Sequence, residues 1–263
     1  MSDLADRRAF AAALAEEAGA YALARFRDLG GLAVEAKGHH DLVSDADRAT
    51  EDLIRARIAE RWPGDGIVGE ERGAEPGETG FDWVIDPIDG TANFVRGLPH
   101  WCTVIACAEG GLPVAGAIHD PNTGETFQAA RGLGGTVGQR PLAVARATGL
   151  DAGSVAIGCS GRSDRAGAVA LVSGVLERGG MFFRSGSGAL MLAHVAAGRL
   201  LGYVEEHMHP WDCFAALLMI EEAGGRVRPL DASALARGTR VVAGAPGVFA
   251  ALEEIADSAL AEH

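Results

Sequence analysis

The hydrophobic pattern at the start of the chain predicts two amphipathic helices. Apolar side chains recur at helical spacing over residues 3–26. A second helix is expected after Ser44, because a serine cap followed by acids such as Asp47 is typical of a helix start. That helix should run to about Glu60 and end before a Pro-Gly pair.

The next stretch of the chain consists of short β-like runs separated by turns. The expected strands cover residues 81–85, 103–107, 114–118, 125–127 and 135–137. The second and third strands flank Glu109-Gly110-Gly111 and are expected to form a hairpin. This half of the chain therefore predicts helices packed on one antiparallel sheet.

After about Leu142 the pattern changes to alternating strands and helices. The expected strands cover residues 155–157, 181–183, 200–204 and 241–242. The expected helices cover residues 164–176, 187–197 and 211–223, and a final helix carries Leu252, Ile255, Ala256 and Ala259. Such alternation favours an α/β arrangement. We therefore expect two closely packed subdomains, residues 1–142 and 143–263.

Composition narrows the class of protein. The 263 residues are 48% hydrophobic, which suffices for a core, and the net charge of −13 disfavours nucleic-acid binding. The four cysteines form no CxxC pair, which favours a reducing compartment. The acidic start does not resemble a signal peptide, and no apolar run is long enough for a bilayer. The sequence thus predicts a cytoplasmic protein with no membrane or nucleic-acid partner.

The most informative stretch is Asp86-Pro87-Ile88-Asp89-Gly90-Thr91-Ala92-Asn93-Phe94, which follows a hydrophobic strand. Its turn can direct two carboxylates and a backbone carbonyl into one pocket, and Mg²⁺ prefers such oxygen ligands. Gly90 allows close approach to the backbone, and Thr91 supplies a hydroxyl. An ordinary Asp-Pro turn with an Asx cap has the same Asp-x-x-Asp spacing, so the inference rests on the whole string.

This string resembles the DPxDGTxNF motif of the inositol monophosphatase family, which are Mg²⁺-dependent, lithium-sensitive phosphomonoesterases. Four further motifs of that family are matched in order: residues 41–47 resemble D-x-V-T-x-A-D, Gly69-Glu70-Glu71 resembles GEE, residues 184–189 resemble R-x-GSAA, and Trp211-Asp212 followed by residues 222–225 resembles WD…EAGG. The chain departs from these patterns at Ser44, Gly188 and Phe214. The resemblance covers nearly the whole chain and implies a layered αβαβα sugar-phosphatase fold.

The resemblance also implies a role for each matched residue. The first metal would be held by Glu70, Asp86 and the Ile88 carbonyl, the second by Asp86, Asp89 and Asp212, and a third, weaker one would lie near Glu70. The implied catalytic residues are Glu70, Thr91 and Asp47, of which the last two orient or deprotonate the attacking water. The implied substrate contacts are Gly90, Thr91, Gly186, Gly188, Glu205 and Asp212, with the first two amides binding phosphate. Taken singly, Asp47 and Asp212 could merely complement helix dipoles.

Elementary chemistry supports a metal-based reaction independently. Hydrolysis of a phosphate monoester depends mainly on positioning and charge neutralisation. Two cations about 4 Å apart can bind both the attacking and the leaving oxygen. No nucleophilic side chain is then needed, which agrees with a sequence that contains no convincing catalytic triad.

The sequence leaves the substrate open. The leading hypothesis is hydrolysis of inositol monophosphate or a similar polyol phosphate with two or three Mg²⁺, and the alternative is histidinol phosphate, an amino alcohol phosphate. Fructose-1,6-bisphosphate and 3′-phosphoadenosine phosphate rank lower because the motifs have few basic neighbours, namely Lys37, Arg96, Arg162 and Arg184. A transcription-associated binding role is a further hypothesis. A homodimer is what the resemblance implies, and the roles of His39, His40, His207 and His209 stay open.

Overall fold

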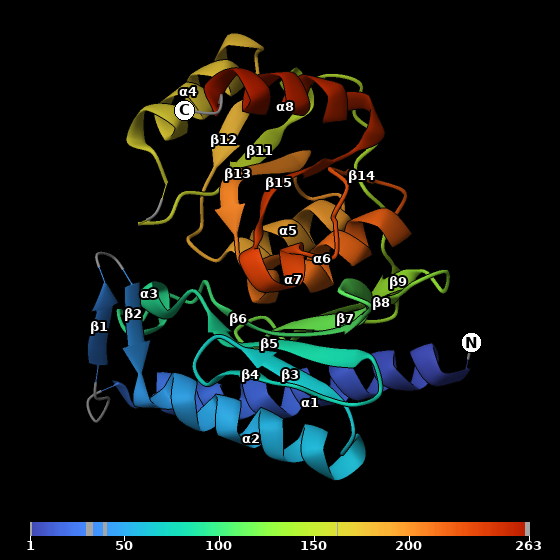
Figure 1. Cartoon of the computed structure of the whole chain (residues 1–263). Helices are drawn as coiled ribbons and strands as arrows, with labels where there is room; N and C mark the ends of the chain where they lie inside the picture. The colour runs from blue at the N-terminus through green and yellow to red at the C-terminus, as the bar shows by residue number, and fades with distance from the viewer. Residues whose placement is uncertain (1, 30–33, 39–40, 162, 261–263) are drawn as a thin grey trace.

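The computed structural model describes residues 2–29, 34–38, 41–161 and 163–260, and Figure 1 shows their layered arrangement. Helices α1 (Ser2–Phe26) and α2 (Asp45–Arg61) form the first layer, against the eight-stranded sheet. Both helices confirm the sequence prediction. Ser44 is the N-cap of α2 as expected, within a capping box in which its backbone amide donates to Asp47 Oδ2 at 2.8 Å.

The eight-stranded sheet forms the second layer, in the order β10-β9-β8-β7-β6-β5-β3-β4. In chain order its strands are β3 (Gly66–Gly69), β4 (Gly73–Glu75), β5 (Phe81–Asp89), β6 (Cys102–Glu109), β7 (Leu112–Asp120), β8 (Glu125–Ala130), β9 (Gly135–Val137) and β10 (Arg140–Pro141). All neighbouring pairs are antiparallel, as predicted, except β3 and β5. Their parallel register places Gly69 opposite Ile85. Glu70 therefore leaves β3 beside Asp86.

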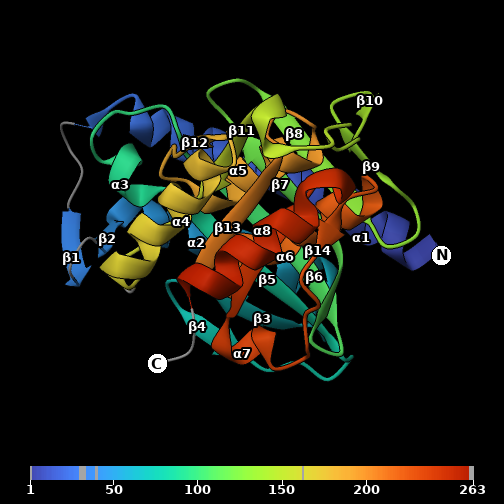
Figure 2. The ribbon, with the colours of Figure 1, turned by 90° about the horizontal axis from the view of Figure 1, so that it is seen from above.

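The remaining layers come from the second half of the chain (Figure 1). Helices α5 (Gly188–Ala196) and α6 (Pro210–Glu222) lie between the two sheets. The five-stranded sheet has the order β12-β11-β13-β15-β14, with strands β11 (Ser154–Ile157), β12 (Met181–Phe183), β13 (Gly202–Met208), β14 (Arg226–Val227) and β15 (Thr239–Gly244). Helices α4 (Arg165–Glu177) and α8 (Pro246–Ala259) cover its outer face, as Figure 2 shows from above. These layers confirm the predicted αβαβα fold.

The second sheet is mixed. Strands β12, β11 and β13 are parallel, whereas β15 is antiparallel to both β13 and β14. Strand β13 begins two residues later than predicted and extends to Met208. This shift matters for the site, because it places Glu205 within the strand.

Several short elements were not predicted. They include the strands β4, β10 and β14, the hairpin β1 (Val34–Gly38) and β2 (Asp41–Ser44), the helices α3 (Thr91–Phe94) and α7 (Ala234–Arg237), and the 3₁₀ turn η2 (Leu150–Ala152). The roles of His39 and His40 stay open, because both lie outside the described residues, as do Arg162 and the side chain of Lys37. No helix in the described part of the chain is long and apolar enough to cross a membrane.

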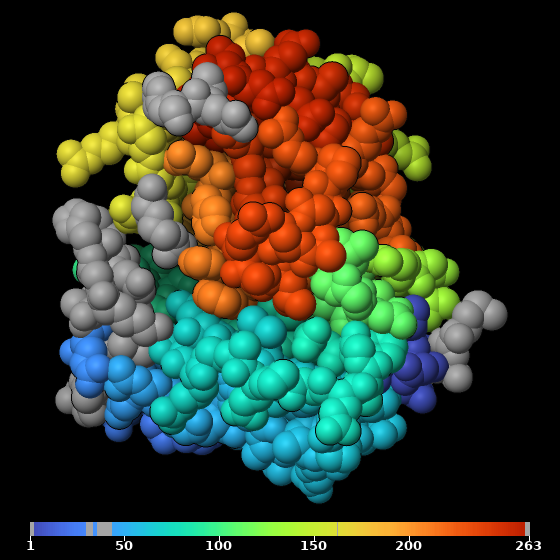
Figure 3. Space-filling model, in the orientation of Figure 1, coloured from blue at the N-terminus to red at the C-terminus, as the bar shows by residue number. Residues whose placement is uncertain are grey.

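Apolar side chains fill each space between layers. The central core joins buried residues of the first sheet, such as Phe127, to those of α5 and α6, such as Leu217. One flanking core includes Trp83 and lies under α1 and α2, and another includes Val242 and lies under α4 and α8. Figure 3 shows the later half of the chain, in orange and red, seated on the cyan and green first half. A subdomain boundary at residue 142 stays a prediction.

Candidate metal and phosphate site

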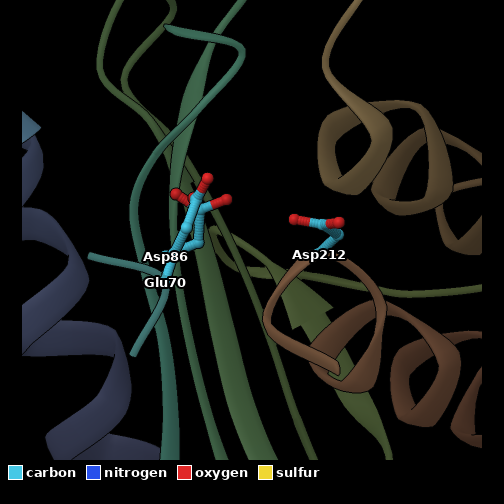
Figure 4. Close-up of side chains that lie close together, drawn as sticks. All are labelled: Glu70, Asp86 and Asp212. Atoms are coloured by element: carbon cyan, nitrogen blue, oxygen red, sulfur yellow. The ribbon is translucent and has the colours of Figure 1, made fainter. Parts of the chain in front are cut away.

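Three carboxylates converge where the two halves of the chain meet. Ligand oxygens of Glu70, Asp86 and Asp212 all lie within 4.8 Å of one another. Figure 4 shows Glu70 and Asp86 side by side from the first sheet, with Asp212 facing them from the start of α6. Three of the metal ligands implied by the sequence are thus brought together. An all-oxygen set of buried or half-buried carboxylates suits a hard divalent cation such as Mg²⁺ or Mn²⁺.

An irregularity in β5 explains how the Asp86 and Asp89 carboxylates become neighbours. Residues an odd number apart in a regular strand point to opposite faces. The pairing of β5 with β6 shifts between Asp86 and Asp89, as in a β-bulge. The Ile88 amide donates to Asp86 Oδ1 at 2.9 Å, and the Thr103 hydroxyl donates to the Pro87 carbonyl at 2.9 Å. These hydrogen bonds fix the bulge that turns the second carboxylate inward.

The electrostatics of the cluster favour bound protons or cations. Burial raises the pKa of Asp86 well above its usual range, and the neighbouring Glu70, Asp89 and Asp212 carboxylates raise it further. Burial also raises the pKa of Asp212, and the neighbouring Asp89, Glu70 and Glu205 carboxylates raise it further. A divalent cation would relieve this repulsion, so the charge of the residues present fits a metal.

Asp89 is held by the opposite half of the molecule and is not a member of the three-carboxylate cluster. Its Oδ2 accepts hydrogen bonds from the Ser187 hydroxyl and, at 2.8 Å, from the Ala189 amide at the start of α5. Burial raises the pKa of Asp89, and the hydrogen bond from Ser187 opposes that rise. These donors fix the orientation of the Asp89 carboxylate at the edge of the cavity described below.

Thr91 and Asp47 form the predicted pair. Thr91 Oγ1 lies 2.9 Å from Asp47 Oδ1 and 3.1 Å from the Ile88 carbonyl. The preceding Gly90 has a φ of 101°, and a side chain there would meet the His100 carbonyl at 2.9 Å. The turn therefore requires glycine on two grounds. Burial raises the pKa of Asp47, while hydrogen bonds from Ser44 and Thr91 lower it.

A cavity of about 130 Å³ adjoins the carboxylates. Its lining includes Asp89, Asp212, Gly186, Gly188 and Glu205 from the predicted set, together with Cys159, Arg184, Tyr203 and Met208. Glu205 is buried, and the Tyr203 hydroxyl donates to its Oε2 at 2.6 Å. Every substrate-contact residue predicted in the second half thus borders one cavity.

His207 and His209, whose roles the sequence leaves open, lie near the start of α6 and are not members of the carboxylate cluster. His207 Nε2 is 2.8 Å from the Arg237 carbonyl. The ring of His209 stacks on Trp211 with centroids 4.5 Å apart. The His207 ring thus contacts a backbone carbonyl, and the His209 ring contacts an indole.

Sequence reasoning missed three side chains around the site. Ser187 lies within the segment that resembles R-x-GSAA, where no local pattern indicates that its hydroxyl would bind Asp89. Tyr203 alternates with Glu205 along a strand, a spacing that does place both on one face. Glu51 gave no usable signal, because a Glu four residues before Arg55 is typical of an exposed helix.

Comparison with known proteins agrees with this geometry. Residues 3–263 match the inositol monophosphatase family. The chain is 40% identical to Nus factor SuhB of Xylella fastidiosa, covering 81% of this chain and 78% of that one. It is also 40% identical to inositol-1-monophosphatase SuhB of Mycobacterium tuberculosis, covering 92% and 90%. The crystal structure of extragenic suppressor protein suhB from Bartonella henselae superimposes with a TM-score of 0.87 at 31% identity, covering 92% and 95%.

The layered fold, the carboxylate cluster and these relatives define a phosphatase, a hydrolase of phosphate monoesters. The chain belongs to the inositol monophosphatase family.

Proposed function

We propose that the protein is a Mg²⁺-dependent phosphomonoesterase for inositol monophosphate or a similar polyol phosphate. One observation carries the proposal: a three-carboxylate cluster from both halves of the chain borders a polar cavity containing Glu205. The cluster would hold cations and phosphate, and the cavity would hold the polyol. A relative at 40% identity is named inositol-1-monophosphatase SuhB, which favours this class of substrate.

The metal ligands in this proposal follow the family resemblance. Glu70, Asp86 and the Ile88 carbonyl would hold one cation, Asp86, Asp89 and Asp212 a second, and Glu70 a third, weaker one. Bound Mg²⁺ would neutralise charge on the transferring phosphoryl group and favour ionisation of water. Lithium inhibition is part of the same proposal.

The chain's own groups would position the reactants. Asp47 accepts the Thr91 hydrogen bond, so the threonine oxygen lone pairs are directed to orient a water molecule, and Asp47 can take up its proton. The Gly90 and Thr91 amides would bind phosphate oxygens at the end of β5. Glu205, held by Tyr203, would accept hydrogen bonds from substrate hydroxyls, while Gly186 and Gly188 leave room for the ring.

The decisive experiment is a substrate panel with Mg²⁺. We expect inositol-1-phosphate to give the highest kcat/KM among inositol-1-phosphate, histidinol phosphate, fructose-1,6-bisphosphate and 3′-phosphoadenosine 5′-phosphate. Arg184 is the one cation that lines the cavity among the described residues, which argues against a second phosphate. Full activity in EDTA, or wild-type kcat in Asp89→Asn, would contradict the metal mechanism. If histidinol phosphate gives the highest kcat/KM, the proposed polyol phosphate is wrong and the substrate is an amino alcohol phosphate.

A homodimer is the proposed assembly, and an exposed apolar face supports it. Val169 and Leu176 of α4 and Met181 and Phe182 of β12 are 69%, 45%, 61% and 48% exposed. Apolar patches of this kind commonly mark protein interfaces. Sedimentation analysis should give a dimer, and Phe182→Glu should give a monomer. A monomeric wild type at micromolar concentration would reject the assembly.

The proposed setting is the cytoplasm. All four cysteines are free thiols, and three of them are buried. Thiols that form no disulfide suit a reducing compartment. Fractionation of the native cell, with the protein detected by antibody, tests this location.

A second role in transcription has one observation in its favour, the 40% identity to a relative named Nus factor SuhB. Co-elution with purified bacterial RNA polymerase in gel filtration tests it, and separate elution would reject it. Asp89→Asn is the useful control, because a binding role would survive the loss of phosphatase activity.

A further inference from the structure

A buried carboxylate lies beneath the turn that carries Glu70. Glu51 of α2 has no exposed surface. Its Oε2 accepts the Glu71 amide at 2.8 Å, and its Oε1 accepts the Arg72 amide at 3.0 Å. These are the two backbone amides that directly follow Glu70, so one side chain fixes the path of the turn.

Arg55 completes this arrangement. Its Nε donates to Glu51 Oε1 at 2.8 Å, its Nη2 donates to the Gly73 carbonyl, and its Nη1 donates to Glu75 at 3.0 Å. The ion pair therefore holds the turn through both amides and a carbonyl. A side chain at Gly69 would lie 2.4 Å from Glu51 Oε1, so only glycine lets the carboxylate approach the end of β3.

The same helix also carries Asp47, which accepts the Thr91 hydrogen bond. Asp47 and Glu51 are four residues apart and thus lie on one face of α2. A single rigid element therefore supports the Thr91 hydroxyl through one acid and the Glu70 turn through the other. Buried ion pairs add little net stability, because desolvation offsets their attraction. We therefore attribute the Glu51–Arg55 ion pair to positioning of the turn rather than to stability.

We propose that Glu51, supported by Arg55, is a positioning residue that holds Glu70 in place for a divalent cation. The inference rests on the proposed metal-dependent function and deepens it. Groups that orient a metal ligand typically change metal affinity by about 10–100-fold when they are removed. Glu51→Gln keeps the size of the side chain, yet its NH₂ group can accept no hydrogen bond, so one of the two amides loses its partner.

The test measures cation binding directly on the full-length protein. Mn²⁺ binding is followed by electron paramagnetic resonance and calorimetry, and kcat is measured as Mg²⁺ is raised. We expect Glu51→Gln to weaken the tightest Mn²⁺ site by about tenfold or more. The Mg²⁺ concentration for half-maximal activity should rise by a similar factor, and kcat at saturating Mg²⁺ should recover. Loss of folding alone would not produce that recovery.

Asp52, the residue after Glu51 on α2, provides a matched control. Asp52 bonds to Arg72 at 2.7 Å on the exposed surface, so Asp52→Asn removes a nearby ion pair without touching the backbone of the turn. It should bind Mn²⁺ like the wild type. Arg55→Lys keeps the charge but loses the forked contacts. Its Mn²⁺ affinity should lie between those of the wild type and Glu51→Gln. This variant supplies the test if Glu51→Gln does not fold.

The possible outcomes distinguish failure of the positioning role of Glu51 from failure of the proposed metal-dependent function. Wild-type Mn²⁺ affinity in a folded Glu51→Gln protein would overturn the positioning role while leaving phosphatase activity intact. A loss of kcat that saturating Mg²⁺ does not restore would also overturn it. A wild-type protein that binds no Mn²⁺ would instead remove the proposed metal-dependent function, and the positioning role with it.

Discussion

Asp89 and Ser187 lie 98 residues apart in the sequence, yet the Ser187 hydroxyl donates a hydrogen bond to Asp89 Oδ2. The contact joins the last residue of β5 to the residue that precedes α5. It therefore fixes a proposed metal ligand of one half of the chain with a group from the other half.

Removing this hydroxyl should impair the reaction. Ser187→Ala removes the one hydroxyl that donates to Asp89 Oδ2 and leaves that oxygen with the Ala189 amide and the weak Cys102 thiol donor, so the carboxylate is held less tightly. We expect kcat to fall by about tenfold, the usual size of such orienting effects. The control is Ser185→Ala, because the hydroxyl of Ser185 makes only long contacts of 3.4–3.5 Å within its own turn. Equal rates in the two variants would refute the role given to Ser187.

The Thr91 hydroxyl should matter more than its methyl group. Thr91→Val preserves shape but removes the hydrogen bond to Asp47, and we expect kcat to fall by about 10²-fold or more. Thr91→Ser keeps the hydroxyl and should retain most activity. Single-turnover kinetics with inositol-1-phosphate distinguishes the two variants. Similar rates in both would argue against proton transfer through this pair.

Tyr203 should affect binding of the polyol rather than the chemistry. Tyr203→Phe removes the hydrogen bond to Glu205, worth about 1 kcal/mol, so KM for inositol-1-phosphate should rise about fivefold. Hydrolysis of p-nitrophenyl phosphate, which has no polyol, should not change. The chain's other tyrosine, Tyr21, offers the control Tyr21→Phe, because its hydroxyl accepts a hydrogen bond from Arg25 on α1 at 2.7 Å. A raised KM for both substrates would contradict the assignment.

Gly90 should tolerate no side chain. Its φ of 101° disfavours L-residues by about 1–2 kcal/mol, and a Cβ would also meet the His100 carbonyl at 2.9 Å. Gly90→Ala should therefore lower the free energy of unfolding by more than that amount and abolish activity. Gly80→Ala is the matched control, since Gly80 has a φ of 84° with nothing within 4 Å. Urea unfolding of both variants measures the difference, and equal losses would show that the collision is unimportant.

Cation binding should stabilise the protein more at higher pH. Burial, and then the neighbouring carboxylates, raise the pKa of Asp86 and Asp212 above their unfolded values of about 3.9. Without a cation, these groups contribute stability below the unfolded pKa and lose it as pH rises through the raised folded pKa. Mg²⁺ replaces the protons, so the gain in Tm on adding it should grow from about pH 5 to about pH 7.5.

Calorimetry in two buffers of different ionisation enthalpy checks the accompanying proton release. Asp86→Asn removes one carboxylate of the cluster and should shrink the stabilisation by Mg²⁺. Asp52→Asn, which lies on the exposed side of α2, should not. A gain in Tm that is independent of pH would contradict the raised pKa values.

Sequence patterns predicted what is local in this fold. Helical spacing placed α1, and the serine cap placed α2, because both signals lie within a few residues. The motif at Asp86 predicted neighbouring carboxylates for the same reason. The parallel pairing of β3 with β5 was not foreseen, since it depends on contacts between strands separated by β4 and its loop.

The supporting contacts were harder to predict than the ligands they support. Glu51 and Arg55 have the spacing of an exposed ion pair, and only the turn after β3 buries them. Ser187 reaches Asp89 because α5 packs at the junction of the two sheets. Such contacts arise from how distant elements meet, which no local pattern records.

The division of the carboxylate cluster between two halves has a consequence for biosynthesis. Glu70 and Asp86 leave the ribosome well before Asp212, because about 125 residues separate Asp86 from Asp212 in the sequence. A growing chain therefore carries an incomplete cluster until α6 has folded onto that sheet. Catalysis that depends on the full cluster can therefore begin only after α6 has been synthesised and packed.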